Sequence, residues 1–371
     1  MTKVRVLVVE DSTTVRRHIV DALSSDPELE VVGEAADGAT AIEHCKRLRP
    51  DVITLDIVMP GVDGLSAVEQ IMGDCPTPIL IVSSSTERGE LFRTYEALAA
   101  GAVEVLEKPD GTEPEGCWEA ELRATLKLVA KIRVITHPRI RLERAATRAR
   151  PVAAPPLAPG LRAVVMGAST GGPAAVLQIL RGLPADFPLP ILLVIHIGKL
   201  FASSLAEWLD ALSPLPVACA LDGEPMPLPG RGRVVMAPPG CHLAVRDGRL
   251  RLEDGPERNY CRPSVDVLFE SAASALGPKA VGCLLTGMGR DGARGLLALK
   301  QSGAPTIAQD ETSSVVFGMP KEAIALDAAV RVLPVDRIAA ALLELARGDP
   351  ATVEVMAASA GNGRPSRGGP A

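Results

Sequence analysis

A serine in a short glycine-rich turn has the surroundings of a nucleophile. Gly167, Ser169 and Gly171 follow the apolar run AVVM and precede a predicted helix near 173–182. A Gly-x-Ser-x-Gly turn between a strand and a helix exposes the serine hydroxyl, and backbone amides at the helix start can hold an oxyanion. A phosphate-binding loop or an ordinary tight turn is the alternative, because small Gly, Ser and Thr loops after strands are common.

A serine nucleophile requires a histidine that removes its proton and a carboxylate that orients the histidine. His196 ends the apolar run PILLVIH, and Asp291 lies in the loop GMGRDG that follows another apolar run. Both are expected at the carboxyl edge of the sheet that carries Ser169. We therefore predict a catalytic set of Ser169, His196 and Asp291, with the Met288 amide as an oxyanion donor. The alternative for His196 is a packing role. The alternatives for Asp291 are an ordinary Asp-Gly turn or a cap on the predicted helix near 293–302.

The order of these residues argues against an α/β-hydrolase, which places its acid before its histidine. No histidine follows Asp291 in the sequence. That fold would require His242 to pair with Asp210 or Asp222. We instead predict that His242 is structural or faces the substrate.

A second group of polar residues follows the strands of the N-terminal region. Glu10 and Asp11 come just after the first apolar run, and Asp56 ends the third. Three carboxylates at one edge of a parallel sheet repel each other unless a hard divalent cation such as Mg²⁺ lies among them. Ser83 and Lys108 end two further runs, and they would stabilise a phosphoryl group on Asp56. Solvated loop acids are the alternative.

The elements that must position the N-terminal group form an alternating α/β pattern over residues 1–133. Strands are predicted at 4–9, 29–35, 51–56, 78–84 and 103–107, and helices near 13–24, 39–48, 64–72, 89–100 and 117–133. Five strands interleaved with five helices predict a parallel, doubly wound sheet with both faces covered.

A second α/β pattern occupies residues 161–350. Strands are predicted at 162–169, 190–196, 232–238 and 279–287, with a hairpin in 241–252 that turns at Asp247 and Gly248. This pattern predicts a doubly wound domain with a mostly parallel sheet and makes some antiparallel pairing expected. Residues 134–160, rich in Pro, Ala and Arg, predict a linker, and residues 351–371 predict a disordered tail.

Composition limits the classes of function. A chain of 371 residues is long enough for about two domains. Only 2% of the residues are aromatic and the net charge is −6, which argues against nucleic-acid binding. The charge is uneven, because residues 1–136 hold 14 Lys and Arg against 24 Asp and Glu, whereas residues 161–350 hold 18 against 19. An acidic first half and a neutral second half indicate two different functions.

Cysteine use and the N-terminus indicate a compartment. The seven cysteines are odd in number and scattered, which disfavours a disulfide framework and a structural zinc. The start, MTKVRVLVVEDSTT, lacks the pattern of a secretory signal, and no apolar run is long enough to span a bilayer. We expect a reduced, soluble, cytoplasmic protein without direct membrane insertion.

The segments VVEDS, DIVMPGVDG, IVSSS and Lys108-Pro109 together resemble the response-regulator receiver domains of two-component signalling. The resemblance covers residues 1–133 and implies phosphorylation of Asp56 by a histidine kinase. It implies Mg²⁺ ligation by Glu10, Asp11, Asp56 and the Val58 carbonyl, a switch role for Ser83 with Ser84 as the alternative, and a phosphate contact for Lys108. Val105 stands where receivers often have an aromatic residue.

The segments GASTGGP, VIH, RPSVDVLF, LLTGMGRDG and QDETSSVVFGMP resemble the catalytic domain of chemotaxis protein-glutamate methylesterases. The resemblance implies Ser169 as nucleophile, His196 as general base and Asp291 as its orienter, with no cofactor for the esterase step. Met288 would contribute to the oxyanion hole, and Thr170, Gly171 and Gly172 would shape the pocket. The implied substrates are glutamate γ-methyl esters, and often glutamines, of methyl-accepting chemoreceptors.

Two alternatives stay open at this point. A receiver could control a non-catalytic output domain that acts by binding a partner. A methylesterase could also serve a signalling pathway other than chemotaxis.

Overall fold

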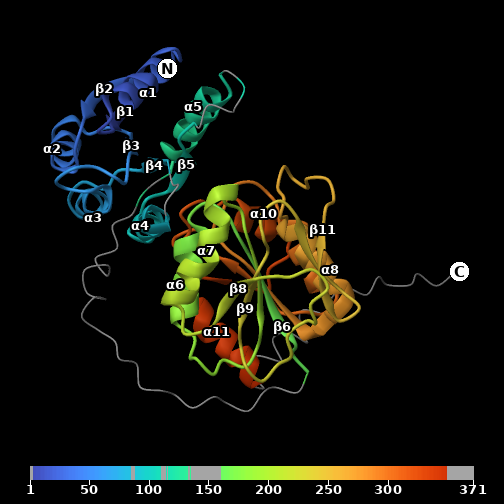
Figure 1. Ribbon diagram of the computed structural model, residues 1–371. Helices are drawn as coiled ribbons and strands as arrows, with labels where there is room; N and C mark the ends of the chain where they lie inside the picture. Colours follow the sequence, from blue (N-terminus) through green and yellow to red (C-terminus); the bar gives the residue numbers. More distant parts are fainter. Residues whose placement is uncertain are drawn as a thin grey trace, which may run out of the picture. The chain divides into compact units, whose positions relative to one another are not determined.

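The computed structural model describes residues 3–84, 88–109, 114, 116–132, 134 and 160–348. The chain divides into two compact units, one around a five-stranded sheet and one around a seven-stranded sheet (Figure 1). Apart from its two end residues, the predicted linker 134–160 lies outside the described residues, as does the predicted tail 351–371. Among the described helices, none is long and apolar enough to cross a membrane.

The first unit alternates strands and helices as predicted. Its elements are β1 (Val4–Val9), α1 (Thr13–Ser24), β2 (Leu29–Ala35), α2 (Gly38–Leu48), β3 (Val52–Leu55), α3 (Gly64–Asp74), β4 (Ile79–Ser83), α4 (Arg88–Ala99), β5 (Glu104–Glu107) and α5 (Cys117–Val129). The strands pair in parallel in the order β2-β1-β3-β4-β5. The predicted five-stranded parallel fold is confirmed.

Burial and capping explain why these segments adopt their structure. The central strands β3 and β4 are buried along their whole length, because helices cover both faces of the sheet. α1 and α5 pack together, and α2, α3 and α4 form a second row. Ser12, Asp37 and Asp63 cap α1, α2 and α3, and each side chain accepts a hydrogen bond from an amide of the first turn. These caps set the helix starts directly after the strand-end loops.

The remaining elements belong to the second unit, except that residues 197–208 group with the first. They are β6 (Ala163–Ala168), α6 (Gly172–Arg181), β7 (Ile191–Ile195), α7 (Lys199–Leu212), β8 (Val217–Cys219), β9 (Val234–Met236), β10 (His242–Arg246), β11 (Arg249–Glu253), α8 (Val265–Leu276), the short 3₁₀ helix Gly277–Lys279, β12 (Ala280–Leu284), α9 (Ala293–Gln301), β13 (Thr306–Gln309), α10 (Met319–Ala325), β14 (Arg331–Leu333) and α11 (Val335–Arg347).

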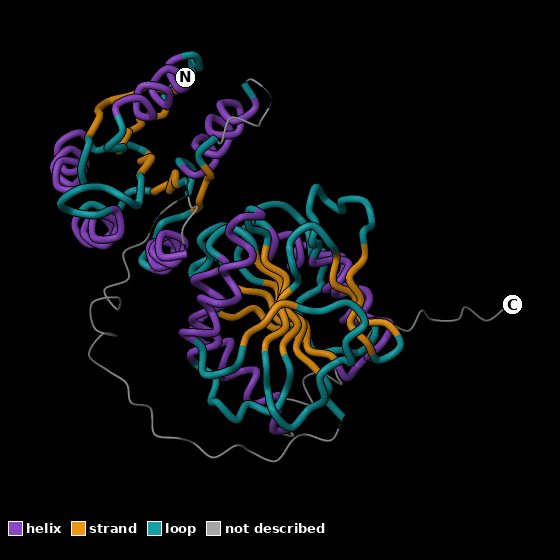
Figure 2. Tube along the Cα trace, viewed as in Figure 1, coloured by secondary structure: helices purple, strands orange, loops and turns teal. Residues whose placement is uncertain are grey.

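Seven of these strands form one sheet in the order β14-β13-β12-β6-β7-β9-β8. All of its described pairings are parallel, and helices flank the sheet on both sides (Figure 2). The predicted hairpin forms, with Asp247 and Gly248 both at positive φ, but β10 and β11 make a separate two-stranded sheet. The antiparallel pairing expected for this unit occurs in the hairpin and in two isolated bridges, not in the seven-stranded sheet.

Strand order determines which loops can meet. β6 lies in the middle of the seven-stranded sheet, with β12 on one side and β7 on the other. Because all three strands are parallel, the loops at their carboxyl ends come to one edge of the sheet. Asp291 lies in the loop after β12, Ser169 directly follows β6, and His196 directly follows β7.

Candidate functional site

Ser169 is the first residue after β6 and is partly accessible to solvent. Its amide donates to the Thr286 carbonyl at 3.0 Å, and its carbonyl accepts from the Gly172 amide at 2.6 Å. Gly171 adopts a positive φ of 75°, and a Cβ there would lie 2.5 Å from Val315. The turn therefore requires glycine at that position and directs the chain from β6 into α6 immediately after the serine.

The backbone brings His196 beside this turn. Ala168 and Ile195 are partners across β6 and β7, and the His196 amide donates to the Ala168 carbonyl at 3.0 Å. His196 thus occupies the position on β7 that corresponds to Ser169 on β6. Its side chain is 14% exposed, and its Nε2 lies 2.9 Å from Oδ2 of Asp291. The structure brings all three predicted catalytic residues to one edge.

Asp291 is held by hydrogen bonds from several directions. Oδ1 accepts from Ser264 Oγ at 2.7 Å and from Asn259 Nδ2 at 3.0 Å. Oδ2 accepts from the Val265 amide at 2.6 Å, in addition to its contact with His196. Since Val265 begins α8, the carboxylate also lies at the positive end of that helix. Asp291 caps α8, and the alternative of a cap on the helix near 293–302 is not what the structure shows.

His242 supports the site from behind. It is buried, its Nδ1 accepts from the Ser264 amide at 3.1 Å, and its Nε2 lies 3.0 Å from the Pro256 carbonyl. Asp210 and Asp222 instead accept from the amides of Val217 and Leu252. His242 therefore hydrogen-bonds to neither acid, and its burial and contacts favour a structural role over one that faces the substrate.

The electrostatics favour a charged imidazole. Burial opposes the charge on His196, but hydrogen bonds and charge interactions with Asp291 and Cys261 outweigh it and raise its pKa to about 9. Burial likewise opposes the charge on Asp291, but the contact with His196 and the hydrogen bonds from Asn259 and Ser264 lower its pKa. Both shifts indicate an ion pair between acid and base.

An oxyanion donor is available beside the serine. A Cβ on Gly287 would lie 2.6 Å from the Ser169 Cβ, so the chain passes directly against Ser169 there. The next residue is Met288, and among the described residues its amide donates to no acceptor. A free amide in that position is able to stabilise negative charge on a tetrahedral intermediate. Thr170 is buried, and its carbonyl accepts from the Thr286 hydroxyl at 3.0 Å.

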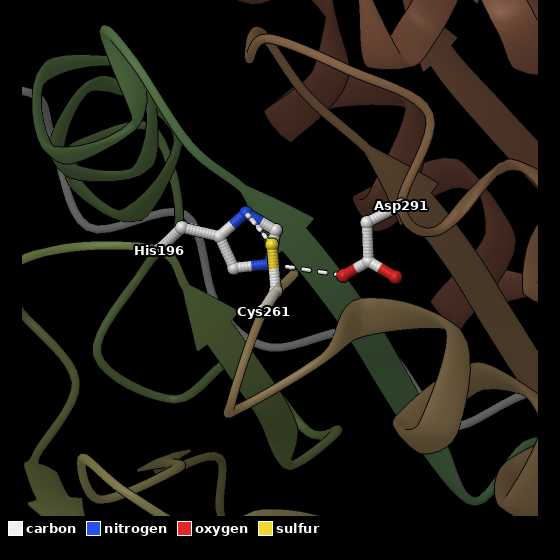
Figure 3. Close-up of side chains that lie close together, drawn as sticks. All are labelled: His196, Cys261 and Asp291. Atoms are coloured by element: carbon white, nitrogen blue, oxygen red, sulfur yellow. Dashed lines mark hydrogen bonds and ion pairs between the residues drawn. The ribbon is translucent and has the colours of Figure 1, made fainter. Parts of the chain in front are cut away.

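The sequence did not indicate that a cysteine contacts the predicted base. Sγ of Cys261 lies 3.6 Å from Nδ1 of His196, the ring nitrogen that does not contact Asp291 (Figure 3). In the part of the chain that the structure describes, the Ser169 hydroxyl makes no hydrogen bond, to His196 or to another group. Cys261 directly precedes the segment RPSVDVLF, and that adjacency was the available signal.

A cysteine, a histidine and an aspartate also suggest a metal centre, and their ligand atoms lie within 4.8 Å of one another. However, His196 directs Nδ1 at Cys261 and Nε2 at Asp291. A single metal ion would bind one ring nitrogen, and the sulfur and the carboxylate oxygen would both have to lie around that same nitrogen. The arrangement therefore fits proton transfer through the imidazole better than metal ligation.

The first unit places its predicted polar residues together. Lys108 Nζ lies 2.7 Å from Asp56 Oδ2 and 2.8 Å from Glu10 Oε2. Glu10 and Asp56 are buried, and Asp11 beside them is exposed. Burial is the largest cause that raises the pKa of Glu10, and Lys108 opposes it.

These residues fit a hard divalent cation. One carboxylate oxygen each of Glu10, Asp11 and Asp56 lies within 4.8 Å of the others. Oε2 of Glu10 is buried and has no hydrogen-bond donor in line, although Lys108 lies close enough for an ion pair. This buried oxygen, with two further carboxylates nearby, suits Mg²⁺.

Three further predicted positions lie around this group. Ser83 ends β4 and is buried, whereas Ser84 is exposed. The Ser83 carbonyl accepts from the Lys108 amide at 2.9 Å. The Val58 amide donates to Asp56 Oδ1 at 3.2 Å, and Val105 is half-buried on β5. Ser83 is thus the serine that lies at the end of the strand, and this position favours it over Ser84 for the switch role.

Comparisons with known proteins cover both units. The family description "CheB methylesterase" matches residues 164–342, and "Response regulator receiver domain" matches residues 6–114. The "Protein-glutamate methylesterase/protein-glutamine glutaminase 2" of Anaeromyxobacter dehalogenans is 46% identical over 344 residues, which are 93% of this chain and 97% of that protein.

A similarly named protein of Geobacter metallireducens, numbered 4, is 45% identical over 349 residues, 92% of this chain and 99% of its own. Among solved structures, the Thermotoga maritima CheB methylesterase catalytic domain is 39% identical. It covers 50% of this chain and 99% of its own, with a TM-score of 0.47.

Proposed function

The chain belongs to the family of receiver-bearing protein-glutamate methylesterases, and from that premise we propose that Ser169, His196 and Asp291 carry out its hydrolysis. The family expected from the sequence is confirmed, and the protein is a carboxylic ester hydrolase. The observation that supports the catalytic set most strongly is the 2.9 Å contact between His196 and Asp291 beside the Ser169 turn.

In the proposed mechanism, Ser169 attacks the carbonyl carbon of a glutamate γ-methyl ester. Because Asp291 occupies Nε2 of His196, Nδ1 is the nitrogen that takes the serine proton. The Met288 amide then stabilises the oxyanion of the tetrahedral intermediate. His196 returns the proton to the leaving methanol, and water hydrolyses the acyl-enzyme by the same route.

The same groups would serve a glutamine substrate. The relatives carry the double name methylesterase and glutaminase. Deamidation differs only in that ammonia leaves in place of methanol, so it requires the same nucleophile, base and oxyanion donor. We include deamidation of protein glutamine in the proposed activity.

The first unit supplies the control. Asp56 is proposed as the phosphoacceptor, with a histidine kinase as donor and Ser83 and Lys108 as contacts of the phosphoryl group. Glu10, Asp11, Asp56 and the Val58 carbonyl would hold Mg²⁺, whose charge offsets that of the phosphoryl oxygens. The esterase step needs only the residues of the second unit.

Methyl-accepting chemoreceptors are the proposed substrates, in keeping with the methylesterase family match. We place the protein in the cytoplasm, where all seven cysteines would stay reduced, as they are in this structure. A signalling pathway other than chemotaxis would need the same chemistry on a different methylated protein.

Replacing Ser169 tests the catalytic set. The full chain carrying Ser169→Ala should lose methanol release from methylated chemoreceptor by roughly 10³-fold or more, because the covalent route is removed. Released methanol is measured against the unaltered chain, with Cys241→Ser as a control elsewhere in the same unit. Retained turnover in Ser169→Ala would refute the assignment, and its loss excludes an output domain that acts only by binding.

Replacing Asp56 tests the control. A small phosphodonor such as acetyl phosphate with Mg²⁺ should raise the methanol release of the unaltered chain and leave that of Asp56→Asn at its basal value. Asp74→Asn, an exposed carboxylate of the same unit that pairs with Lys46, is the matched control. Equal stimulation of Asp56→Asn would contradict phosphorylation at this residue.

A further inference from the structure

A second candidate nucleophile, a thiol, contacts the base of the proposed catalytic set. Asp291 occupies Nε2 of His196, so Nδ1 is the nitrogen available as a proton acceptor. In this structure Nδ1 faces the thiol of Cys261 at 3.6 Å, while the Ser169 hydroxyl has no hydrogen-bond partner among the described residues. The site therefore contains a second set of nucleophile, base and orienting acid, which consists of Cys261, His196 and Asp291.

The backbone around Cys261 fixes this placement. Residues Arg258 and Cys261 exchange two backbone hydrogen bonds of 3.1 and 3.0 Å, which closes a two-residue turn. Both turn residues, Asn259 and Tyr260, are left-handed, with φ of 53° and 63°. Such strain in non-glycine residues persists only where the surroundings enforce it, and it is concentrated at functional sites.

Side chains on both sides enforce the turn. The Arg258 guanidinium makes two hydrogen bonds of 2.5 Å to Glu270 on α8. Asn259 donates to Asp266 at 2.9 Å and to Asp291 at 3.0 Å. The turn that carries Cys261 is thus tied to the same carboxylate that orients His196, and the thiol and the base are positioned as one assembly.

Cys261 is also accessible, in contrast to the buried cysteines of the chain. Cys45, Cys75 and Cys283 are fully buried, whereas Cys261 is half-buried. Cys241 has a similar exposure in the same unit, but among the described residues its sulfur donates hydrogen bonds only to the carbonyls of Pro238 and Pro239. Cys241 is therefore the matched reference for a thiol without a base.

Resting on the proposed catalytic set, we propose that Cys261 is a thiol modification site, deprotonated by His196, at which a hydroperoxide or an alkylating electrophile stops ester hydrolysis. With hydrogen peroxide, the Cys261 sulfur bonds to one oxygen and the O–O bond breaks. The thiol proton passes through His196 to the second oxygen, which leaves as water. Sulfur is oxidised by two electrons to a sulfenic acid, and the peroxide is reduced.

The loss of activity follows from competition for one nitrogen. Ser169 and Cys261 both need Nδ1 of His196, because Asp291 holds Nε2. An oxygen or carbon group added to the Cys261 sulfur would fill the space beside Nδ1 and keep the serine from it. Reduction of the sulfenic acid by a thiol would restore the site.

Iodoacetamide labelling of the full chain measures the thiol directly. The sulfur displaces iodide, the proton goes to His196, and the labelled peptides are quantified by mass spectrometry. In the unaltered chain Cys261 should react roughly tenfold or more faster than Cys241, and His196→Gln should remove that difference. Equal rates for the two cysteines in the unaltered chain would overturn the proposal.

Esterase activity measures the consequence. After iodoacetamide or hydrogen peroxide, the unaltered chain and Cys241→Ser should lose methanol release, each relative to its own untreated sample. Cys261→Ser should keep its own untreated rate, and dithiothreitol should restore only the peroxide-treated samples. Inactivation of Cys261→Ser as fast as the unaltered chain would show that modification elsewhere is responsible.

The two assays separate this proposal from the proposed function. Labelling does not require turnover, and Ser169→Ala should label at Cys261 as fast as the unaltered chain. A chain with no activity on methylated receptor but with fast labelling that depends on His196 would refute the substrate, not the thiol site. Full esterase activity with slow labelling of Cys261 would refute the thiol site alone.

Discussion

A single carboxylate, that of Asp291, performs two tasks in the second unit. It caps α8 through the Val265 amide and orients His196 through the same oxygen atom. Asn259 and Ser264 hold its other oxygen. A carboxylate with this many donors cannot rotate without leaving several of them unsatisfied. The orientation of the base is therefore coupled to the packing of a helix, which makes the site rigid.

The pKa of His196 predicts how activity depends on pH. Burial opposes its charge, but Asp291 and Cys261 outweigh burial and raise the pKa to about 9. If the neutral imidazole accepts the proton of Ser169, as proposed, kcat/KM for methyl ester hydrolysis should rise from pH 7 with a midpoint near pH 9 and level off about one pH unit above it. Cys261→Ser should move this midpoint to lower pH, because one of the contacts that stabilise the imidazolium is removed.

The measurement uses Ser169→Ala at each pH to subtract spontaneous ester hydrolysis.

The same raised pKa of His196 stabilises the folded state, and the linkage between protonation and folding gives the pH range in which it does so. The contribution is complete below pH 6.5, the value of an unperturbed histidine, and is lost as pH rises through about 9. A kcat/KM profile that is already flat at pH 7 would contradict a charged resting base.

At the scale of elements, the strained turn is the feature with the clearest energetic consequence. Tyr260 is 94% exposed and left-handed, so its ring adds little burial while its backbone costs about 1–2 kcal/mol. Tyr260→Gly should raise the free energy of unfolding by about 0.5–1 kcal/mol, after the extra entropy of an unfolded glycine is subtracted. Urea unfolding followed by circular dichroism measures the change.

Tyr260→Ala is the matched control, because it removes the ring and keeps the left-handed strain. It should leave the free energy of unfolding nearly unchanged. If alanine and glycine stabilise the protein equally, the exposed ring rather than the backbone is the source of the cost.

The elements differ in how well sequence predicts them, for physical reasons. Strands such as β6 and β7 are apolar runs of six and five residues, buried along their whole length, and their composition and length identify them. The edge strands β8 and β14 have three residues each, too few to carry a pattern, and they were not predicted. β13 was also not predicted, although β3 and β5, which have the same length, were.

The candidate site divides in a similar way. Ser169, His196 and Asp291 were predictable because each follows a buried strand, and strand ends of a parallel sheet converge. Cys261 follows a tight turn instead of a strand, and 65 residues separate it from His196. Strand-end reasoning does not reach such a residue, and only the three-dimensional contacts place it at the base.

At the scale of the whole molecule, the uneven charge and the two separate cores point to different responses to ions. The first unit gathers Glu10, Asp11 and Asp56 around one cation, that of Lys108. The second unit is nearly neutral, and its site charges are paired within the protein. A ligand that binds only the folded first unit should stabilise that unit alone.

We therefore expect Mg²⁺ to raise the stability of the first unit selectively. Binding at 100 times its Kd would add about 2.7 kcal/mol to the free energy of unfolding of that unit. Calorimetry of the full chain should show one transition that shifts upward with MgCl₂ and one that does not, with NaCl of equal ionic strength as control. Asp11→Asn removes an exposed carboxylate ligand, so its Mg²⁺-dependent shift should shrink while the other transition keeps its midpoint. Equal shifts of both transitions, or an undiminished shift in Asp11→Asn, would show that the cation acts elsewhere than at this cluster.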